Sequence, residues 1–533
     1  MKRVRTLGGA ALAAVAVTLA FGAPARAVDR ALGADVPKPA VTGVPWTERE
    51  IGALGASVDA VLAGAAVLRG AHAGIYAIGA RDGRVLYRRN ADDLFQPAST
   101  FKLLVGSAAL DTLGASFRFR TDVVANGAVA DGKLNGALVL RGGGDPFLNA
   151  ADLDAAAAAV AKAGITRVSG GLWIDDTHFE PPGYLPGWNW DDFSYYYAPV
   201  VSALSFEENV VHLTVTPGPS AGAPATVTAA PIGAVGVPPI VGDRVPADRC
   251  EPTLGVVVVP APVTTGPADA KDTVDVERLP WGCIRVTGTI PLGAKPDVVD
   301  AAVPSPATYA HDAFTAALSR RGVGVFEPHL VGDPWPGAFD HRAFPAPSPN
   351  ATVVWSHDSQ PLRDTLAGMW LPSDNLVAEL LLRQLGFVQG GKPGTTANGI
   401  ALERAWLQKL GVDPAAVAIE DGSGLSGYDR ITPRQLVTIL RHEWDSPNRD
   451  VVLDALPIAG VRGTLKSSYA GTTVERKIFA KTGSVSHVST LAGYAANAKH
   501  GAVIFAFQVD DWIGETAALR DLRARVLALF VES

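Results

Sequence analysis

The sequence is organised around Pro97-Ala98-Ser99-Thr100-Phe101-Lys102, which places a hydroxyl and an amine three residues apart. The apolar run that follows, Leu103–Leu110, predicts a helix buried in a core. Residues three apart on a helix lie one above the other, so the Lys102 amine can reach the Ser99 hydroxyl directly or through one water. A helix N-terminus also directs backbone N–H groups and partial positive charge toward whatever the serine attacks.

Two later motifs make the Ser-x-x-Lys pattern a specific indication of a catalytic site. Alone it is a weak signal, because such short patterns recur by chance and a helix start with a solvated lysine explains it. Ser373-Asp374-Asn375 and Lys481-Thr482-Gly483 follow in the chain. The first can also be the cap of a helix that begins at Leu376, and the second alone is an ordinary strand end. Together the three have the order and residue types of penicillin-binding proteins and serine β-lactamases.

The chemistry of acyl transfer explains why two lysines are needed. A serine hydroxyl is unreactive at its own pKa, so a base must take its proton. We expect neutral Lys102 to be that base for Ser99. A lysine is mostly protonated at neutral pH, but burial and a nearby cation both lower its pKa. We therefore expect Lys481 to stay charged and to keep its neighbour neutral.

The remaining motif residues suit a peptide substrate. We expect the Ser373 hydroxyl to relay a proton to the leaving nitrogen and the Asn375 amide to hold a peptide group. Thr482 supplies a hydroxyl for a free carboxylate beside the second lysine, and Gly483 leaves room for a substrate against the strand. The backbone N–H groups of the attacking serine and of Ser484 would bind the oxyanion.

Both ends of the chain predict parts of the same structure. Thr47 and Glu50 form a capping box that opens an amphipathic helix, and Arg81-Asp82-Gly83 joins two strands before the serine helix. Toward the end of the chain the pattern predicts three strands and a closing helix, at residues 478–482, 490–495, 502–508 and 516–531. These parts predict an α/β (α+β) fold in which helices flank an antiparallel sheet.

A long folded insertion separates the first two motifs. About 270 residues lie between Lys102 and Ser373, far more than a loop of a compact domain contains. Short β-like runs and two helical stretches fill this part of the chain, and prolines and glycines crowd residues 217–246. We therefore predict a catalytic domain from residues 28–119 and 351–533, and an inserted β-rich region of two subdomains at residues 120–350.

The composition limits the classes of partner. The chain has 533 residues, of which 48% are hydrophobic and 19% charged, as in a globular protein of two or three domains. Its formal net charge is −7 and it has no basic run, which argues against nucleic acid as a partner. The histidines are scattered and His442-Glu443 has no second histidine four residues on, so we expect no metal and no cofactor.

The first residues have the pattern of a secretory signal. Basic residues at positions 2, 3 and 5 precede the apolar run Leu7–Phe21, and Ala25-Arg26-Ala27 fits signal peptidase. We predict a signal peptide over residues 1–27 and export to the periplasm or the extracytoplasmic cell-wall space. A retained anchor is the alternative, although the run is short for a bilayer, and no later stretch could span one. In that compartment Cys250 and Cys283 predict a disulfide, with buried free thiols as the alternative.

With these motifs in place, the chain resembles the class C low-molecular-mass penicillin-binding proteins, which are D-alanyl-D-alanine carboxypeptidases and endopeptidases. The resemblance covers nearly all of the chain after the predicted signal peptide. It extends to Gly142-Gly143-Gly144-Asp145-Pro146, Ile174-Asp175-Asp176, Asp421-Gly422-Ser423-Gly424-Leu425-Ser426 and Gly463-Thr464-Leu465. It implies a penicillin-binding-protein or serine β-lactamase-like transpeptidase domain interrupted by two smaller β-rich domains. It also implies peptidoglycan peptides as substrates and β-lactams as covalent inhibitors. The residues that inherit roles by motif are Ser99, Lys102, Ser373, Asn375, Lys481 and Thr482.

One further segment bears on specificity through the resemblance alone. Trp188-Asn189-Trp190-Asp191-Asp192, followed by Tyr195-Tyr196-Tyr197, looks like the segment that in some family members forms a pocket for the end of a diaminopimelyl side chain. The resemblance implies that Asp191 takes the ammonium and that Trp188 and Tyr196 wall the pocket. Arg430 would hold the side-chain carboxylate. Aromatic residues of an ordinary core are the alternative.

Two other functions stay open on the sequence alone. A serine β-lactamase has the same three motifs, but no Glu-x-x-Leu-Asn stretch lies between Asn375 and Lys481 to orient a hydrolytic water. A non-catalytic wall-binding protein of the same fold would have no use for intact motifs. Carboxypeptidase, endopeptidase and transpeptidase activity all fit the motifs equally well.

Overall fold

The two ends of the chain pair in one antiparallel sheet. Its strand order is β17-β18-β19-β1-β2, so the first strand lies beside the last one. β1 pairs with β19 over its whole length, from His72 opposite Asp510 to Gly79 opposite Val503. The predicted antiparallel sheet is confirmed. Its strands are β1 (His72–Gly79), β2 (Val85–Arg89), β17 (Ile478–Val485), β18 (Val488–Asn497) and β19 (Gly501–Asp510).

The structure is a computed structural model. It describes residues 36–230, 258–260, 263–279, 284–326 and 346–533. The predicted signal peptide, Cys250 and Cys283 lie outside these residues. None of the helices that the structure describes combines the length and the hydropathy needed to span a bilayer.

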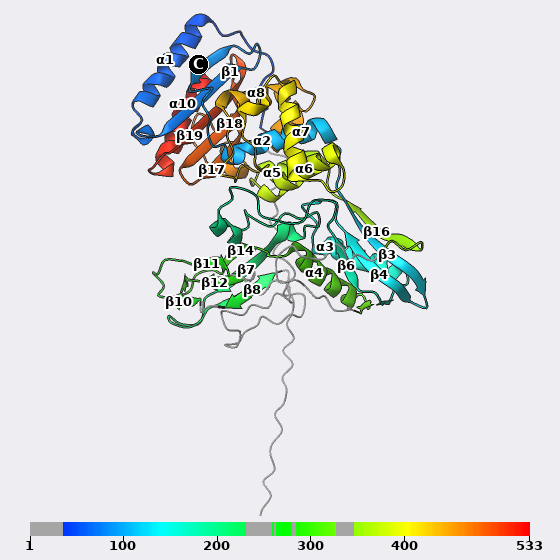
Figure 1. Cartoon of the computed structure of the whole chain (residues 1–533). Coiled ribbons are helices and arrows are strands. Elements are labelled where there is room, and N and C mark those ends of the chain that lie inside the picture. The colour runs from blue at the N-terminus through cyan, green and yellow to red at the C-terminus, as the bar shows by residue number, and fades with distance from the viewer. Residues whose placement is uncertain (1–35, 231–257, 261–262, 280–283, 327–345) are drawn as a thin grey trace, which may run out of the picture.

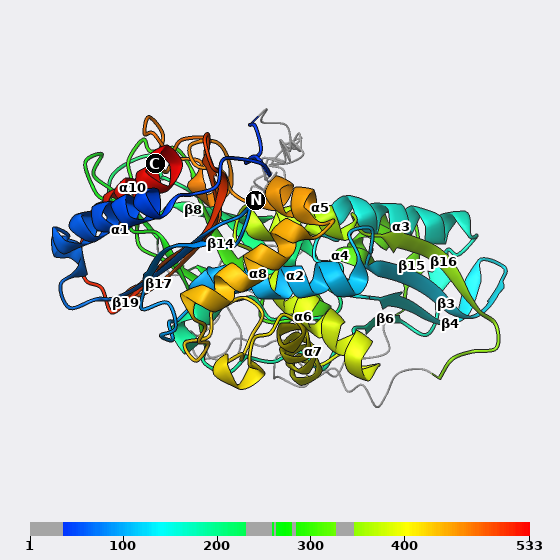
Figure 2. The same cartoon turned by 90° about the horizontal axis from the view of Figure 1, so that it is seen from above.

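Helices cover both faces of the sheet (Figures 1 and 2). On one face α1 and α10 form a buried cluster with Ile75 and Ala77, and on the other α2 and α8 form a second cluster with Tyr76 and Ile78. Successive strand residues point to opposite faces, so β1 serves both layers. We call the sheet and these helices the main body. Its helices are α1 (Glu48–Ala63), α2 (Lys102–Leu113), α5 (Leu362–Trp370), α6 (Asn375–Gly390), α7 (Thr396–Lys409), α8 (Pro433–Asp445), α9 (Arg449–Ala455) and α10 (Thr516–Glu532).

Local signals in the sequence set where these helices begin. Thr47 and Glu50 form the predicted capping box at the start of α1. Asp374 caps α6, where its side chain accepts a hydrogen bond from a backbone N–H of the first turn, as the sequence predicts. The serine helix begins later than predicted. Ser99 lies in a 3₁₀ turn, and the α-helix starts at Lys102.

The inserted region lies between α2 and α5. Its described residues form one large sheet of order β15-β5-β4-β3-β16, with β6 beside β4, and three smaller sheets of order β14-β7-β8, β11-β12-β9 and β10-β13. Two helices, α3 and α4, contribute side chains to its core. Its elements are β3 (Arg120–Ala130), β4 (Lys133–Arg141), α3 (Ala150–Lys162), β5 (Arg167–Val168), β6 (Leu172–Asp175), β7 (Val210–Thr216), β8 (Thr226–Ala230), β9 (Val258–Pro260), β10 (Thr264–Gly266), β11 (Asp275–Arg278), β12 (Ile284–Thr287), β13 (Thr289–Pro291), β14 (Asp297–Ala302), α4 (Pro306–Arg320), β15 (Gly324–Val325) and β16 (Ala351–Asp358).

The sheets of the inserted region share a core. Among the described residues, Leu138 of the large sheet and Leu213 and Val286 of two smaller sheets belong to one buried cluster. β16 pairs with β3, so the predicted boundary at residue 351 falls inside the large sheet, and we place the return to the main body after Asp358. The inserted region also packs on α6, because Val201 and its neighbours form a cluster with apolar residues of that helix.

Candidate active site

The first motif places the buried amine of Lys102 in contact with the hydroxyl of Ser99. Lys102 has no exposed surface, and its Nζ donates a hydrogen bond to Ser99 Oγ at 3.0 Å. The same amine donates to the side-chain oxygen of Asn375 and to the carbonyl of Ser423 at 2.8 Å. The direct contact that the sequence predicts is therefore present. An amine held in this way can take the proton of the hydroxyl if it is neutral.

The second and third motifs form another lysine–serine pair, between Lys481 and Ser373. Lys481 Nζ donates to Ser373 Oγ at 2.8 Å and to the carbonyl of Thr482 at 2.7 Å. Ser373 has a φ of 71°, a left-handed conformation that is uncommon for a residue with a side chain. The hydroxyl of Thr482 lies 2.7 Å from that of Thr464, which belongs to the Gly-Thr-Leu stretch before β17. A cation and two hydroxyls thus stand together where a carboxylate could bind.

Gly483 is required where β17 passes the serine. A Cβ added there would lie 2.9 Å from the backbone nitrogen of Ser99 and 2.8 Å from the Pro97 carbonyl oxygen. It would also lie 2.2 Å from the hydroxyl oxygen of Thr490. A side chain at this position would push the strand away from the nucleophile. Ser484 follows on the exposed part of this outer strand of the sheet.

The inserted region contacts the active site through the main-chain carbonyl of Tyr197. Asn375 Nδ2 donates to the carbonyl of Tyr197 at 2.6 Å. Tyr196, Tyr197 and Glu208 line one pocket together with Ser373 and its neighbours. The sequence analysis included Tyr197 in the specificity segment but missed the role of its carbonyl, because a main-chain acceptor has no motif. It missed Glu208 altogether, which a turn with a φ of 55° brings in.

Two buried carboxylates hold the loop that positions Lys102. Asp421 accepts hydrogen bonds from the N–H groups of Gly424 at 2.6 Å and Ser426 at 2.8 Å. Glu379 accepts from the N–H of Ser423 at 2.8 Å, so the carbonyl of Ser423 is held against the lysine amine. Glu379 was also missed, although it follows Asn375 by four residues and so lies on the same face of α6.

The causes of the pKa shifts of the two lysines differ in part from the prediction made from the sequence. Burial lowers the pKa of Lys102 to about 8, against the opposing charges of Asp421 and Glu379. The pKa of Lys481 lies well below its usual range, first because of burial and then because of the charge of Lys102. The predicted effect of burial on the pKa of Lys102 is confirmed, but the predicted effect of Lys481 is not among its causes; instead the charge of Lys102 lowers the pKa of Lys481. A bound carboxylate would raise the pKa of Lys481 and so favour its charged form.

The four residues of the suggested specificity pocket are spread around the site. The indole of Trp188 donates to Asp421 at 2.8 Å, and Arg430 donates to two nearby carbonyls, those of Gly427 and Asp429. Asp191 is exposed in a 3₁₀ turn, and in the described part of the chain it forms no ion pair with Arg430. Only Tyr196 lines the pocket beside Ser373.

A serine bonded to a buried lysine, with a second serine–lysine pair beside an outer strand, defines a serine acyl-transfer hydrolase of the transpeptidase fold. The sequence profile of the D-Ala-D-Ala carboxypeptidase 3 (S13) family matches residues 54–530. The chain therefore belongs to this family and is a serine-type D-Ala-D-Ala carboxypeptidase.

Known proteins agree with this assignment. The chain is 34% identical over 450 residues to a D-alanyl-D-alanine carboxypeptidase of Actinomadura sp., an alignment that covers 82% of this chain and 77% of that protein. It is 26% identical over 438 residues to the carboxypeptidase DacB of Haemophilus influenzae, covering 82% and 85%. The crystal structure of penicillin-binding protein 4 of H. influenzae matches with a TM-score of 0.71 at 23% identity, covering 88% of this chain and 97% of that one. A second structure of that protein is a complex with a β-lactam.

Proposed function

We propose that this carboxypeptidase removes the terminal D-alanine of peptidoglycan stem peptides and also cleaves D-alanyl cross-links, through an acyl-enzyme on Ser99. The observation that carries the proposal is the 3.0 Å hydrogen bond between the fully buried Lys102 amine and the Ser99 hydroxyl. A lysine whose pKa is lowered toward neutrality can act as a general base. β-Lactams should acylate the same hydroxyl, as the β-lactam complex of the similar H. influenzae protein suggests.

The motif residues divide the reaction between them. Lys102 takes the proton of Ser99 Oγ, which attacks the carbonyl carbon of the penultimate D-alanine. The backbone N–H groups of Ser99 and Ser484 stabilise the oxyanion, each by about 3 kcal/mol. As the C–N bond breaks, the leaving nitrogen takes the hydroxyl proton of Ser373, which is bonded to Lys481, and the proton that Lys102 accepted from Ser99 replaces it. Water then attacks the acyl-enzyme ester, the stem peptide leaves as a carboxylate and Ser99 regains its proton.

The substrate backbone lies along β17 in this proposal. β17 is the outer strand, so an extended peptide can pair with its free edge from Lys481 onward. The terminal carboxylate then meets Lys481 and the hydroxyl of Thr482. Asn375 Nδ2 has one hydrogen left after its bond to the Tyr197 carbonyl, and that hydrogen is available to a substrate peptide group.

The specificity segment adds a finer proposal. Asp191, exposed in a 3₁₀ turn five residues before the pocket-lining Tyr196, is available to the ammonium of a diaminopimelyl side chain. Trp188 and Arg430 act less directly, by fixing the loop that follows Asp421. Asp191→Ala should lower kcat/KM for a diaminopimelyl-ended peptide and leave an analogue without the side-chain ammonium unchanged. Equal effects on both peptides would remove Asp191 from the pocket.

Digestion of purified cross-linked muropeptides tests the main proposal. Wild type should release D-alanine and separated stem peptides, and Ser99→Ala should release neither. Mass spectrometry after incubation with penicillin should find the adduct on Ser99 that persists for minutes. Rapid turnover of penicillin would favour a β-lactamase, and a folded protein whose serine stays unmodified would favour a wall-binding protein.

Export belongs to the proposal as well. Residues 1–27 have the pattern of a signal peptide, and the substrate class lies outside the cytoplasm. Fractionation of cells that express the full chain, beside a chain that lacks residues 1–27, should find only the former outside the cytoplasm. Mass analysis of the exported chain without reduction should detect Cys250 and Cys283 as a bonded pair.

A further inference from the structure

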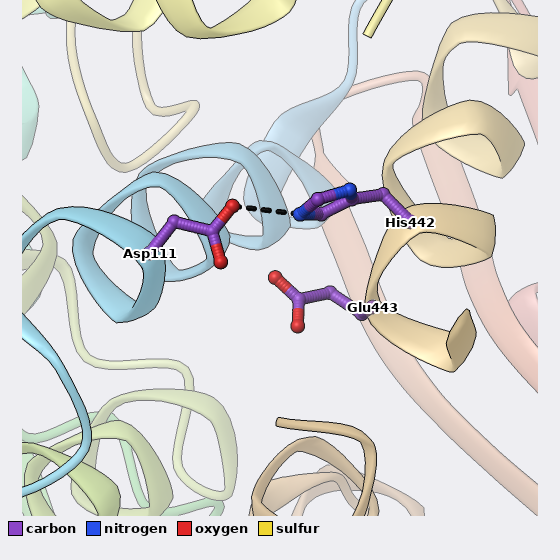
Figure 3. Close-up of side chains that lie close together, drawn as sticks. All are labelled: Asp111, His442 and Glu443. Carbon is purple, nitrogen blue, oxygen red and sulfur yellow. Dashed lines mark hydrogen bonds and ion pairs between the residues drawn. The ribbon is translucent and has the colours of Figure 1, made fainter. Parts of the chain in front are cut away.

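Three potential metal ligands meet where two helices end. Asp111 lies in the last turn of α2, and His442 and Glu443 lie in the last turn of α8. His442 Nε2 is 2.6 Å from a carboxylate oxygen of Asp111. One ligand atom of each of the three side chains lies within 4.8 Å of the others, and Figure 3 shows the carboxylate of Glu443 directed toward the other two. We call these three residues the helix-end cluster.

Among the described residues, His442 is the basic side chain that pairs with a carboxylate of this cluster. Glu443 has no exposed surface, and one of its carboxylate oxygens lacks a hydrogen-bond partner. Its polar neighbours are the hydroxyls of Ser107 and Ser446, which carry no charge. In the described part of the chain neither Glu443 nor Asp111 forms an ion pair with lysine or arginine. Both helices also direct the negative ends of their dipoles here, which favours a cation.

Hydrogen bonds from neighbouring residues fix the orientation of the Asp111 carboxylate, as they do for the ligands of known metal sites. Asp111 accepts hydrogen bonds from the indole of Trp406 at 2.9 Å and from the amide of Asn448 at 3.3 Å. Such outer contacts fix the direction of a ligating carboxylate. One imidazole nitrogen with two carboxylates suits zinc and related divalent ions, and three protein ligands leave one position of a tetrahedral site for water.

We propose that Asp111, His442 and Glu443 bind a divalent cation of the zinc class that joins the ends of α2 and α8. The metal would replace the hydrogen between His442 and Asp111 and would meet the unpartnered oxygen of Glu443. His442-Glu443 looked unpromising in the sequence because no second histidine follows on its helix, but the third ligand comes from α2. Asp111 lies nine residues beyond Lys102, or about 14 Å along the helix, so the ion is structural and takes no part in peptide hydrolysis.

Zinc binding by the full chain tests this proposal. The protein, free of any affinity tag, is stripped with a chelator, dialysed against zinc and assayed by elemental analysis and calorimetry. We expect one zinc per chain and a higher unfolding temperature with zinc. Cobalt in its place should give the visible absorption of a site with a nitrogen ligand. His442→Gln and Asp111→Asn should each weaken binding at least tenfold, a loss typical of metal-site substitutions.

His212→Gln provides the matched control. His212 also contacts a carboxylate, that of Asp300, at 2.7 Å, and its side chain is similarly half-buried. That pair has no third ligand in the described residues, so its loss should leave zinc binding unchanged. D-Alanine release by wild type should not change on stripping. Wild type that binds no zinc at millimolar concentration would overturn the proposal. So would His442→Gln protein that is folded by circular dichroism and binds zinc as tightly as wild type.

Discussion

Raising the pH from 7 to 9 should speed the acylation of Ser99 about tenfold. The general base must be neutral, and burial sets the pKa of Lys102 at about 8. The neutral fraction of Lys102 is then about one tenth at pH 7 and about nine tenths at pH 9. The rate should therefore rise with pH and level off above the pKa. If Lys102 had the ordinary lysine pKa of 10.5, the acylation rate would keep rising throughout this pH range.

The assay is the second-order rate constant of acylation by an uncharged β-lactam, followed by stopped flow. An uncharged reagent keeps the ionisation of Lys481 from entering through carboxylate binding. Glu379→Gln should move the midpoint to lower pH, because the ionised form of Glu379, whose own pKa burial raises to about 8, favours the charged form of Lys102 within this pH range. Its glutamine oxygen can still accept the backbone N–H bonds of the loop.

Glu403→Gln provides the control for the titration. Glu403 is also buried and burial raises its pKa, but it is not among the carboxyls whose charge acts on Lys102, so its replacement should leave the midpoint in place. A flat profile between pH 7 and 9 in wild type would refute the assignment of Lys102 as the base. Equal shifts in Glu379→Gln and Glu403→Gln would refute the electrostatic reasoning.

Two further predictions concern close packing around the site. Gly483→Ala should slow acylation about a hundredfold, because its Cβ would move β17 away from Ser99, and measurement of penicillin labelling rates against an unchanged Gly52→Ala control would detect this. Gly106→Ala should lower the free energy of unfolding by about 1–3 kcal/mol in denaturant titrations, because its Cβ would lie 2.4 Å from the Trp370 ring. An unfolding midpoint equal to that of wild type would show that α2 and α5 can separate at no cost.

The sequence was most informative where a local rule applied. The capping box at Thr47, the cap at Asp374 and the strands at both ends follow from short patterns, and the structure has them. Contact between Ser99 and Lys102 followed from helical spacing, although the residues flank the junction of a 3₁₀ turn and an α-helix rather than one continuous helix.

What the sequence did not predict depends on contacts between distant segments. The carbonyl of Ser423 binds Lys102 only because Glu379, on another helix, holds the loop in place. The main-chain groups in these contacts are the same for every residue type, so no motif marks them. The dominant influence on Lys102, burial, is likewise a property of the assembled core and not of any neighbouring pair of residues.

The bond from Asn375 to the carbonyl of Tyr197 has a consequence for engineering this enzyme. Excising residues 120–358 would leave the motif amide without its acceptor and would uncover Leu376 and Leu380, which pack against Val201. Residues 120–358 thus form part of the catalytic centre and cannot be removed without disturbing it. Chimeras between relatives should stay active only when the exchanged segment brings its own equivalent of Tyr197 to the same place.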